Sequence, residues 1–510
     1  MSGKHSQPIR GLLSAKKSPL FQGRFGRMFR SLPAAKFGPN SQAVLTSLGN
    51  KMSNDFDAPK DGPDDEESGI PALYTYFGQF LDHDITFDPS SSLQKQDDPD
   101  ALTDYRSPAL DMDNIYGRGP DDQPYMYDNT GRKFLLGKAI TGGDPGSFDL
   151  PRNNPNAGDP ARALIGDPRN DENSIVSQLQ GLVLRFHNRV ADQNPPDTPF
   201  SDLQQIVRFH YQYVVVNDFL SRVVNKSVLD DLKKDGIFDR SKLKFFHWKN
   251  EPFMPVEFSV AAYRLGHSMV RPGYRLNDAT LKPIFPVPSQ GLNEGLTGFR
   301  SMISDWAIDW GRFIDIDTRA YTGTPAADQK RLQFAYRIDT SCVNPLANLP
   351  ASVATPPPSS LPVRNLLRGF EMGMPSGQDI ARAMGVKPLP DEKILIGEGV
   401  DKPDGPLPNI LSVDPVFKDN CPLWTYILAE AMVKQDPVTI PVQENSTPGA
   451  KPVVITTPQL GPVGGRIVAE VLLGLIFADN NSYLSLHPNW TPEIGPNYKL
   501  KDFVAFALGR

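Results

Sequence analysis

The stretch Phe77-Gly78-Gln79-Phe80-Leu81-Asp82-His83-Asp84 is the most informative part of the sequence. It places an amide, an imidazole and two carboxylates within six residues, a density that favours a cofactor site over a solvated surface. On a helix, Gln79 and His83 are four residues apart and share one face. Asp82 and Asp84 flank the histidine and point to other sides. Taken alone, the cluster could equally be the acidic end of a solvated helix.

Four further groups of polar residues follow in the chain. They are Leu110-Asp111-Met112-Asp113-Asn114-Ile115-Tyr116-Gly117, Arg169-Asn170-Asp171-Glu172, Ala261-Ala262-Tyr263-Arg264-Leu265-Gly266-His267-Ser268 and Arg364-Asn365-Leu366-Leu367-Arg368-Gly369. In order and spacing, the five groups resemble the peroxidase-cyclooxygenase superfamily, whose members are often called animal haem peroxidases. The resemblance runs from about Ile70 to about Asp479, and the chain looks more similar to bacterial or fungal members than to mammalian ones. Each group is a weak signal alone, but five in the family order are a strong one.

The resemblance implies a mainly α fold, with one large helical haem peroxidase domain, long loops and little β-structure. The 510 residues are 39% hydrophobic, enough for a sizeable core, and 50 prolines and 41 glycines indicate many loops. We expect residues 1–68 to form a basic, extended N-terminal arm whose acidic end, 61–68, is loose. Residues 69–510 then form the catalytic domain. Periodicity predicts helices over 174–194 and 203–224, and the proximal helix is expected over 255–269.

A haem peroxidase needs one histidine on the iron and another, unligated, above it. The chain contains seven histidines. The resemblance makes His267 the proximal iron ligand and His83 the distal acid-base residue. The remaining histidines lie in terminal segments, among aromatic residues or at a charged helix end, where structural roles are more common: His5, His187, His210, His247 and His487.

On the proximal side, the resemblance assigns Asn365 and Arg368 to haem binding. A ligand imidazole needs a hydrogen-bond acceptor that fixes its tautomer and raises its basicity, and Asn365 matches the family asparagine in that role. Arg368 follows one helical turn later, where it could meet a haem propionate. The alternative for Asn365 is a helix cap, since asparagine favours such ends.

On the distal side, His83 can take the proton that hydrogen peroxide loses and return it to the leaving oxygen, since an imidazole titrates near neutral pH. Arg169, always cationic, would stabilise the charge that builds as the O–O bond breaks. Gln79 matches a family glutamine that orients water, peroxide or halide. The alternative for Arg169 is a surface salt bridge with Asp167 or Asp171.

Family members often bind haem b covalently through ester bonds from one aspartate and one glutamate. Asp82 and Glu172 match those positions, so the cofactor is expected to be haem b with these two attachments. In a mammalian leukocyte enzyme, the residue after the glutamate is a methionine that forms an extra sulfonium link. Here that residue is Asn173, so the link is absent.

The family also binds calcium, which takes six to eight oxygen ligands. The resemblance places the ion among an aspartate after the distal histidine and a short loop that ends in Tyr-Gly. At one ligand position an aspartate, Asp113, replaces the serine common in mammalian members. The alternative is an ordinary acidic turn. The matching residues are Asp84, Ser107, Ala109 through its carbonyl, Asp111 and Asp113.

Charge and hydropathy exclude several classes of protein. A net charge of −6 offers no general footprint for nucleic acid, although residues 1–37 are basic. The longest apolar run, 467–478, is too short and polar to be a transmembrane segment. The first 20 residues resemble no secretory signal, and Cys342 and Cys421 could pair but make no disulfide framework. We expect a cytoplasmic protein, or one exported without a classical signal peptide.

Two functions remain open. The first is a haem peroxidase that reduces hydrogen peroxide through a high-valent iron intermediate and oxidises a small-molecule electron donor, either halide or phenolic. The second is a fatty-acid dioxygenase of the cyclooxygenase type, whose radical tyrosine lies three residues before the proximal histidine. That place is Arg264 here, and Tyr263 should point elsewhere because one residue turns a helix by about 100°. A haem-free structural module would need a degenerate catalytic set, which this chain does not have.

Overall fold

The computed structural model describes residues 23–87, 103–104, 106–153, 156, 158–319, 321, 330–398, 406–433, 435–443 and 452–510. Its α-helices are α1 Ser41–Lys51, α2 Leu73–Ile85, α3 Asp113–Tyr116, α4 Ser174–Gln193, α5 Phe200–Val214, α6 Leu220–Val223, α7 Lys226–Asp231, α9 Asn344–Ala347, α10 Leu361–Glu371, α11 Gly377–Ala383, α12 Leu423–Val433, α13 Gly464–Ala478, α14 Tyr483–Leu486 and α15 Leu500–Leu508. The expected mainly α fold with long loops is confirmed.

Strands are short and dispersed. They are β1 Gly23–Gly26, β2 Glu67–Pro71, β3 Thr103–Asp104, β4 Lys233–Lys234, β5 Ile237–Phe238, β6 Met254–Pro255, β7 Gly273–Arg275, β8 Leu281–Pro283, β9 Phe334–Tyr336, β10 Gln435–Gln443 and β11 Pro452–Pro458. The largest sheet among them has the order β3-β1-β6, with β1 antiparallel to β3 and parallel to β6. Strand β2 pairs with β9, and β10 with β11, both antiparallel.

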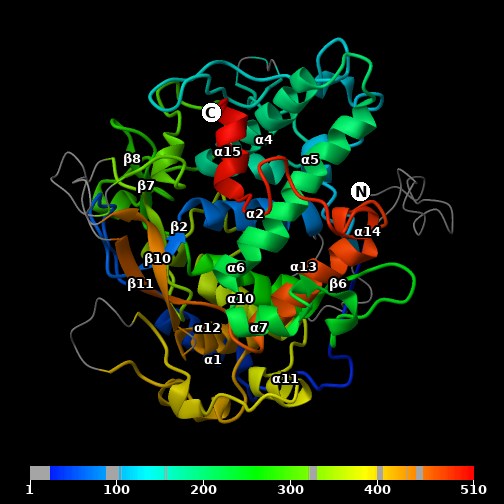
Figure 1. The fold of residues 1–510 in the computed structure, drawn as a ribbon. Helices are drawn as coiled ribbons and strands as arrows, with labels where there is room; N and C mark the ends of the chain where they lie inside the picture. The colour runs from blue at the N-terminus through cyan, green and yellow to red at the C-terminus, as the bar shows by residue number, and fades with distance from the viewer. Residues whose placement is uncertain are drawn as a thin grey trace, which may run out of the picture.

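The helix α2, which carries the opening stretch of the sequence, crosses the centre of the molecule (Figure 1). In that view α4, α5 and α15 lie above it, and α10, α12 and α13 lie below it. Both α12 and α13 are almost wholly apolar and buried, and their side chains belong to one continuous hydrophobic core. The site residues on α2 are therefore carried by an element that is enclosed on both sides.

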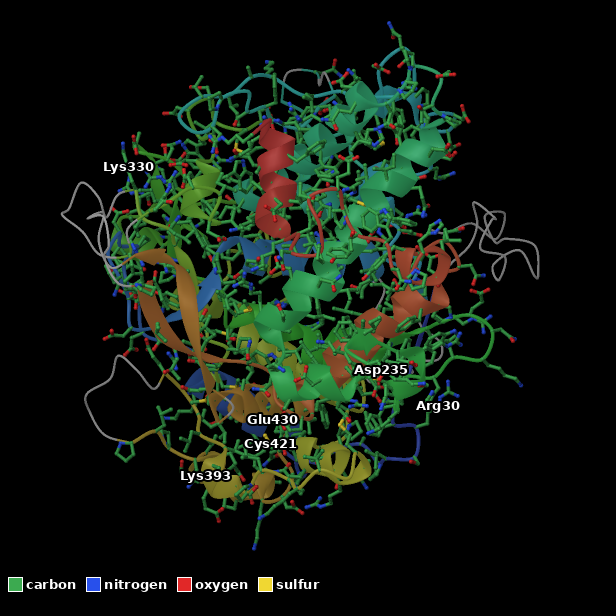
Figure 2. The ribbon with its side chains drawn as sticks, in the orientation of Figure 1. Arg30, Asp235, Lys330, Lys393, Cys421 and Glu430 are labelled. Atoms are coloured by element: carbon green, nitrogen blue, oxygen red, sulfur yellow. The ribbon has the colours of Figure 1, made fainter. Side chains whose placement is uncertain are left out.

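Charged side chains also join elements of this core. The Glu430 carboxylate on α12 accepts hydrogen bonds from the backbone N–H groups of Val463 and Gly464, at the start of α13. An anion at a helix N-terminus satisfies N–H groups that have no partner within the helix. Figure 2 shows this region low in the view, where Glu430 and Cys421 are labelled. Cys421 and Cys342 are both buried and free.

Two helix predictions are confirmed. The segment 174–194 forms α4, and 203–224 forms a helical run of α5, the π-helix η6 (Val215–Phe219) and α6. The segment 255–269 is helical but not α-helical. It consists of the π-helix η8 (Glu257–Ala261) and the 3₁₀-helix η9 (Ala262–His267). Consecutive side chains from Ala262 to His267 are therefore spaced by about 120° around the helix axis, and not by the 100° of an α-helix.

The N-terminal segment packs into the same fold as far as it is described. Helix α1 packs on α10, and the Glu257 carboxylate accepts the backbone N–H groups of Met28 and Phe29. The expectation of a loose acidic end at 61–68 is wrong, because Glu67 is buried and pairs with Arg271 and Arg331. Residues 1–22 of the basic arm lie outside the described residues, so the boundary at residue 68 stays a prediction.

Within the described ranges, no helix is both long and apolar enough to cross a bilayer.

Candidate active site

A cavity of about 850 Å³ lies between α2, η9 and α10. His83 on α2 and His267 at the end of η9 both line it, although they are far apart in the chain. The structure thus brings together the two histidines that the sequence singled out. The other predicted site residues in the wall are Gln79, Asp82, Arg169, Glu172 and Arg368.

The ring of His83 is oriented by two amides. Its Nδ1 lies 2.7 Å from Asn170 Oδ1, and Asn170 Nδ2 donates to Gln180 Oε1 at 2.8 Å. In this arrangement the Asn170 amide oxygen faces the ring, so Nδ1 carries the proton. The other nitrogen, Nε2, is then the basic one and lies 3.6 Å from Glu172 Oε1.

Burial lowers the pKa of His83 to about 3, and the nearby Arg169 cation adds to the effect. The sequence argument assumed an imidazole that titrates near neutral pH. In the structure the ring is instead neutral at pH 7, because the enclosed cavity disfavours its charged form. A neutral ring with a free Nε2 is the form that can accept a proton.

Arg169 lies on η5 (Pro168–Asp171) in the cavity wall, and it forms the salt bridge with Asp167 that the sequence left as an alternative. Its Nη2 donates to Asp167 Oδ2 at 2.8 Å and to the backbone oxygens of His83 at 3.0 Å and Thr86 at 2.6 Å. The guanidinium also stacks 4.6 Å from the centre of the Phe87 ring. The arginine is therefore tied to the end of α2 as well as facing the cavity.

Gln79 and Glu172 form one hydrogen-bonded unit. Gln79 Nε2 donates to Glu172 Oε1, and Asn173 Nδ2 donates to Gln79 Oε1 at 3.2 Å. Burial raises the pKa of Glu172 to about 7. Asn173 is also the N-cap of α4, with its Oδ1 accepting from the N–H groups of Ile175 and Val176. Asn173, which stands where a mammalian relative has a methionine, thus caps the N-terminus of α4.

Asp82 on α2 lines the cavity and directly precedes His83 in the chain. Its Oδ1 accepts a hydrogen bond from Thr86 Oγ1 at 3.1 Å. Burial raises the pKa of Asp82, and Arg169 and Arg264 partly offset this effect. Asp82 and Glu172 therefore border the same space from two elements, as the sequence analysis required.

His267 contacts Asn365, but with a donor direction opposite to the expected one. Asn365 Nδ2 lies 2.7 Å from His267 Nδ1, and its Oδ1 accepts from Arg264 Nη1 at 2.6 Å. The guanidinium has only donors, so it takes the amide oxygen and turns the amide nitrogen toward the ring. Asn365 lies in the middle of α10, which rules out the helix-cap alternative.

Tyr263 lines the cavity, so the expectation that it points elsewhere is wrong. Its hydroxyl donates to the backbone oxygen of Gly78 at 3.1 Å. A 3₁₀-helix such as η9 turns by about 120° per residue, so its winding separates consecutive side chains even more than an α-helix does. Tyr263 and Arg264 nevertheless both line the cavity, which is wide enough to be reached from both directions.

Three carboxylates gather behind α2. The ligand oxygens of Asp84, Asp111 and Asp113 lie within 4.8 Å of one another. Ser107 Oγ donates to Asp111 Oδ2 at 2.8 Å, and the Ala109 backbone N–H donates to the Ser107 oxygen at 2.8 Å. The structure thus brings the predicted calcium ligands of the loop 107–113 next to the remaining predicted ligand, Asp84, which follows His83 on α2.

Sequence reasoning missed three residues that organise the site. Asn170 orients the His83 ring, Arg264 orients Asn365, and Arg106 pairs with Asp167, the partner of Arg169. Asn170 directly follows Arg169 in the chain, which was an available signal. Nothing local in the sequence marks Arg106, because its partners come from other segments.

Comparisons with known proteins agree with this geometry. A family model described as animal haem peroxidase matches residues 92–389, more than half of the chain. Thyroid peroxidase of Canis lupus familiaris is 25% identical over 221 residues, which are 39% of this chain and 22% of that protein. Myeloperoxidase of Homo sapiens is 24% identical over 181 residues, which are 34% of this chain and 22% of that protein. The chain thus matches about a fifth of the length of these curated relatives.

Among solved structures, peroxidase A from Dictyostelium discoideum matches with a TM-score of 0.56 and 14% identity, over 99% of this chain and 98% of that one. At this identity the match establishes the fold alone. The family match, by contrast, spans the acidic loop 107–113, Arg169, His267 and Asn365. The chain therefore belongs to the animal haem peroxidases, a family whose cofactor is haem.

Proposed function

We propose that this chain is a peroxidase that reduces hydrogen peroxide and oxidises a small halide or phenolic donor. The observation that carries the proposal is one cavity lined by two neutral imidazoles with different hydrogen-bond partners, His83 buried and His267 partly buried. Burial lowers the pKa of both His83 and His267 to about 3. A neutral imidazole is what both iron ligation and proton acceptance need.

Haem fits this cavity chemically. His267 would hold the iron, and Arg368, with Arg264 beside it in the wall, would face the propionates. Bound haem supplies the redox chemistry of the reaction. To bind iron through Nε2, His267 must carry its proton on Nδ1, so the Asn365 amide has to turn its oxygen toward the ring. This turn is the one rearrangement that the proposal requires on the proximal side.

The distal residues then have distinct roles. His83 Nε2 accepts a proton from hydrogen peroxide and returns it to the leaving oxygen, while the neutral Asn170 amide keeps the ring oriented. Arg169 provides a fixed positive charge for the oxygen that becomes anionic. Gln79, held by Glu172 and Asn173, is placed to orient water, peroxide or halide.

Asp82 and Glu172 are the candidates for covalent attachment of the haem. Both carboxyl groups face the cavity, and burial raises the pKa of each, that of Glu172 to about 7. A linked haem resists extraction by acidified acetone. We expect the combination of Asp82→Asn and Glu172→Gln to release the haem under those conditions, with each single change leaving one attachment.

Calcium is the proposed occupant of the acidic cluster. Within the described residues, Asp84 Oδ1 and Asp113 Oδ1 are buried without a hydrogen-bond partner. Burial, followed by the neighbouring carboxylate Asp111, raises the pKa of Asp113 to about 8 and that of Asp84 well above its usual range. Three clustered carboxylates, two of them with a buried oxygen that has no hydrogen-bond partner, are the kind of ligand set that a hard divalent cation prefers. Ser107 and the Ala109 carbonyl would complete the set.

The dioxygenase alternative needs a tyrosine that can carry an oxidising equivalent to a lipid. Tyr263 lines the cavity, but its hydroxyl is hydrogen bonded to the Gly78 oxygen, and Arg264 occupies the place of the family's radical tyrosine. These contacts favour the peroxidase.

The test is a stopped-flow Soret spectrum of haem-loaded protein mixed with hydrogen peroxide, repeated with bromide and with a phenol. We expect a rapid change in the Soret band that one of the donors reverses, which also names the donor class. A spectrum that responds only to a polyunsaturated fatty acid with oxygen would overturn the peroxidase in favour of the dioxygenase.

A further inference from the structure

Arg106 lies between the acidic cluster and the distal arginine. Its Nη1 is 3.4 Å from Asp113 Oδ1, and its Nε donates to Asp167 Oδ2 at 2.9 Å. Asp167 in turn accepts from Arg169 Nε at 3.2 Å and from Nη2 at 2.8 Å. A continuous series of charges, Asp113 to Arg106 to Asp167 to Arg169, therefore connects the cluster behind α2 with the cavity in front of it.

The two links that Arg106 makes differ in kind. The contact with Asp167 is a pair of hydrogen bonds from Nε and Nη2 to a fully buried carboxylate. The contact with Asp113 is an ion pair without a hydrogen bond, and Asp113 Oδ1 is one of the buried oxygens left without a hydrogen-bond partner among the described residues. A cation that binds the cluster can thus take over Asp113 without breaking a hydrogen bond to Arg106.

The backbones of the two segments are also in close contact. A Cβ atom added at Gly166 would meet the backbone oxygens of Asp113 and Asn114 at 2.6 Å. Gly166 immediately precedes Asp167, and its backbone oxygen accepts from Arg106 Nη2 at 3.3 Å. A shift of the acidic loop would therefore displace the backbone at Gly166, and with it the adjacent Asp167.

We propose that Arg106 is a positioning residue that couples occupation of the acidic cluster by a divalent cation to the hold of Asp167 on Arg169. The inference rests on the proposed function, because it treats the cluster as a cation site and Arg169 as the distal cation. It goes beyond that function by naming the residue that connects them.

The direction of the coupling follows from the two contacts that Arg106 shares. Without the cation, Arg106 contacts both Asp113 and Asp167. A bound cation takes the Asp113 oxygens as ligands and leaves Arg106 to Asp167 alone, so Asp167 then holds Arg169 less strongly. Arg169 becomes more available to an anion in the cavity. Cation binding should thus raise the affinity of the ferric haem protein for an anionic ligand.

Cyanide is a suitable probe because its binding to ferric haem is read from the Soret band without turnover. Its dissociation constant is measured with saturating Ca²⁺ and with a chelator, in the wild type and in Arg106→Gln. We expect Ca²⁺ to raise the cyanide affinity of the wild type about tenfold, within the usual range of coupling between sites. In Arg106→Gln the two constants should agree within about twofold, because the link is removed.

Reciprocity supplies a second readout that does not depend on the haem spectrum. If Ca²⁺ tightens cyanide binding, cyanide must tighten Ca²⁺ binding by the same factor. Calorimetric titration of Ca²⁺ with and without cyanide should show this factor in the wild type and lose it in Arg106→Gln.

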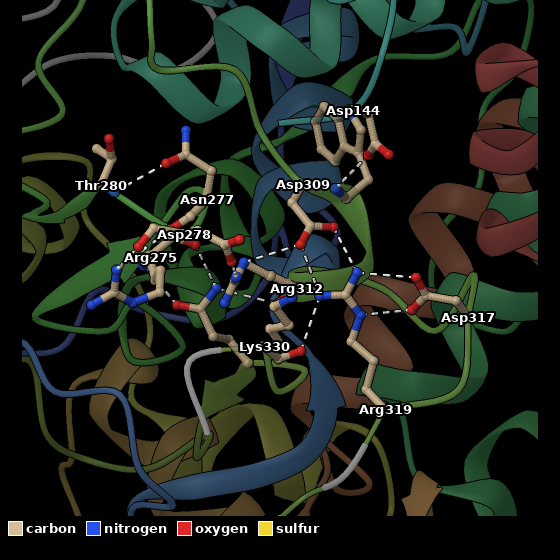
Figure 3. A network of polar contacts seen from close by, with 12 residues as sticks. Asp144, Arg275, Asn277, Asp278, Thr280, Asp309, Arg312, Asp317, Arg319 and Lys330 are labelled. Carbon is tan, nitrogen blue, oxygen red and sulfur yellow. Dashed lines mark hydrogen bonds and ion pairs between the residues drawn. The ribbon is translucent and has the colours of Figure 1, made fainter. Parts of the chain in front are cut away.

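The control is Arg319→Gln. Arg319 pairs with Asp309 and Asp317 in a separate network far along the chain, shown in Figure 3. Its side chain is 14% exposed and that of Arg106 is 12% exposed, so the two changes remove arginines of similar burial, each paired with two carboxylates. We expect Arg319→Gln to keep the wild-type coupling factor, which separates the specific link from a general loss of stability.

A wild type without calcium-dependent cyanide affinity, or an Arg106→Gln protein that keeps the full factor, would overturn the inference. If Arg106→Gln does not fold, Arg106→Lys gives the same test, because one ammonium cannot reproduce both contacts and the factor should fall below that of the wild type. Failure of the proposed function looks different. In that case peroxide leaves the Soret band unchanged, while the coupling between Ca²⁺ and cyanide can still be measured.

Discussion

The distal and proximal sides of the cavity hold the same kind of side chain in different ways. His83 lies on the regular helix α2 and its Nδ1 faces an amide oxygen, whereas His267 ends a 3₁₀-helix and its Nδ1 faces an amide nitrogen. The difference comes from the next partner: the neutral Gln180 behind Asn170, and the cationic Arg264 behind Asn365. Under the proposed function, His83 is thus already arranged as a proton acceptor, whereas the Asn365 amide would have to turn before His267 could hold the iron.

The largest effect should come from removing the proximal imidazole. His267→Ala deletes the proposed iron ligand, so we expect haem affinity to fall by more than the factor of about 10 to 100 that loss of a ligand's hydrogen-bond partner costs. Haem titration followed by the Soret band measures this. His247→Ala is the control, since His247 is exposed and contacts the Lys244 backbone oxygen. Unchanged haem binding and an unchanged spectrum in His267→Ala would mean that His267 is not the iron ligand.

Removal of the distal imidazole should separate binding from reaction. His83→Ala is expected to keep haem, because the distal ring is not a ligand, and to slow the reaction with hydrogen peroxide by about 10² to 10⁴. Stopped-flow measurement of that rate, beside equilibrium haem binding, distinguishes the two effects. A variant that reacts with peroxide at the wild-type rate would remove His83 from the mechanism.

His187 is a buried histidine outside the cavity, and it tests how burial alone changes the pKa of an imidazole and the pH dependence of stability. His187 on α4 contacts the Tyr116 hydroxyl and the Arg132 backbone oxygen, and burial lowers its pKa to about 4. Its unfolded pKa is about 6.5, so the unfolded chain binds an extra proton between these values. The stability associated with the neutral ring is complete above about pH 6.5 and is lost as the pH falls toward 4, by about 3 kcal/mol.

Denaturant unfolding of the haem-free protein between pH 7 and pH 4 measures this loss. His187→Gln should show a shallower fall in the free energy of unfolding, whatever its stability at pH 7. His247→Gln serves as the matched change at an exposed histidine and should keep the wild-type slope. An identical slope in His187→Gln would mean that other groups account for the acid sensitivity.

The smallest effect concerns the amide that has to turn. Asn365→Ala removes the partner of His267 and leaves Arg264 without its acceptor, so we expect haem affinity to fall about 10- to 100-fold and the ferric spectrum to shift. Asn348→Ala, an exposed asparagine elsewhere, is the control. If Asn365→Ala matches the wild type in both measurements, the proximal hydrogen bond has no role in holding the cofactor.

Much of the site could be predicted because its chemistry is local in the chain. Gln79, Asp82, His83 and Asp84 occupy one helical turn and a half, and their spacing alone puts Gln79 and His83 on one face of the helix and Asp84 on another. The helices α4 and α5 followed from periodicity for the same reason. The prediction of an α-helix over 255–269 was wrong, since apolar spacing does not distinguish an α-helix from a π-helix followed by a 3₁₀-helix. Tyr263 was misplaced because the sequence does not show how far the cavity extends around this segment.

The sequence by itself determined the family and singled out His83, His267 and the acidic residues of the cluster, because residue types and their spacing carry that information. Only the tertiary structure decided which nitrogen of His83 is basic, which way Asn365 donates, and that Arg106 joins the cluster to Arg169. Each of these depends on atoms from distant segments that meet at about hydrogen-bond distance. A hydrogen bond or ion pair has a direction and a partner only once those segments are packed together.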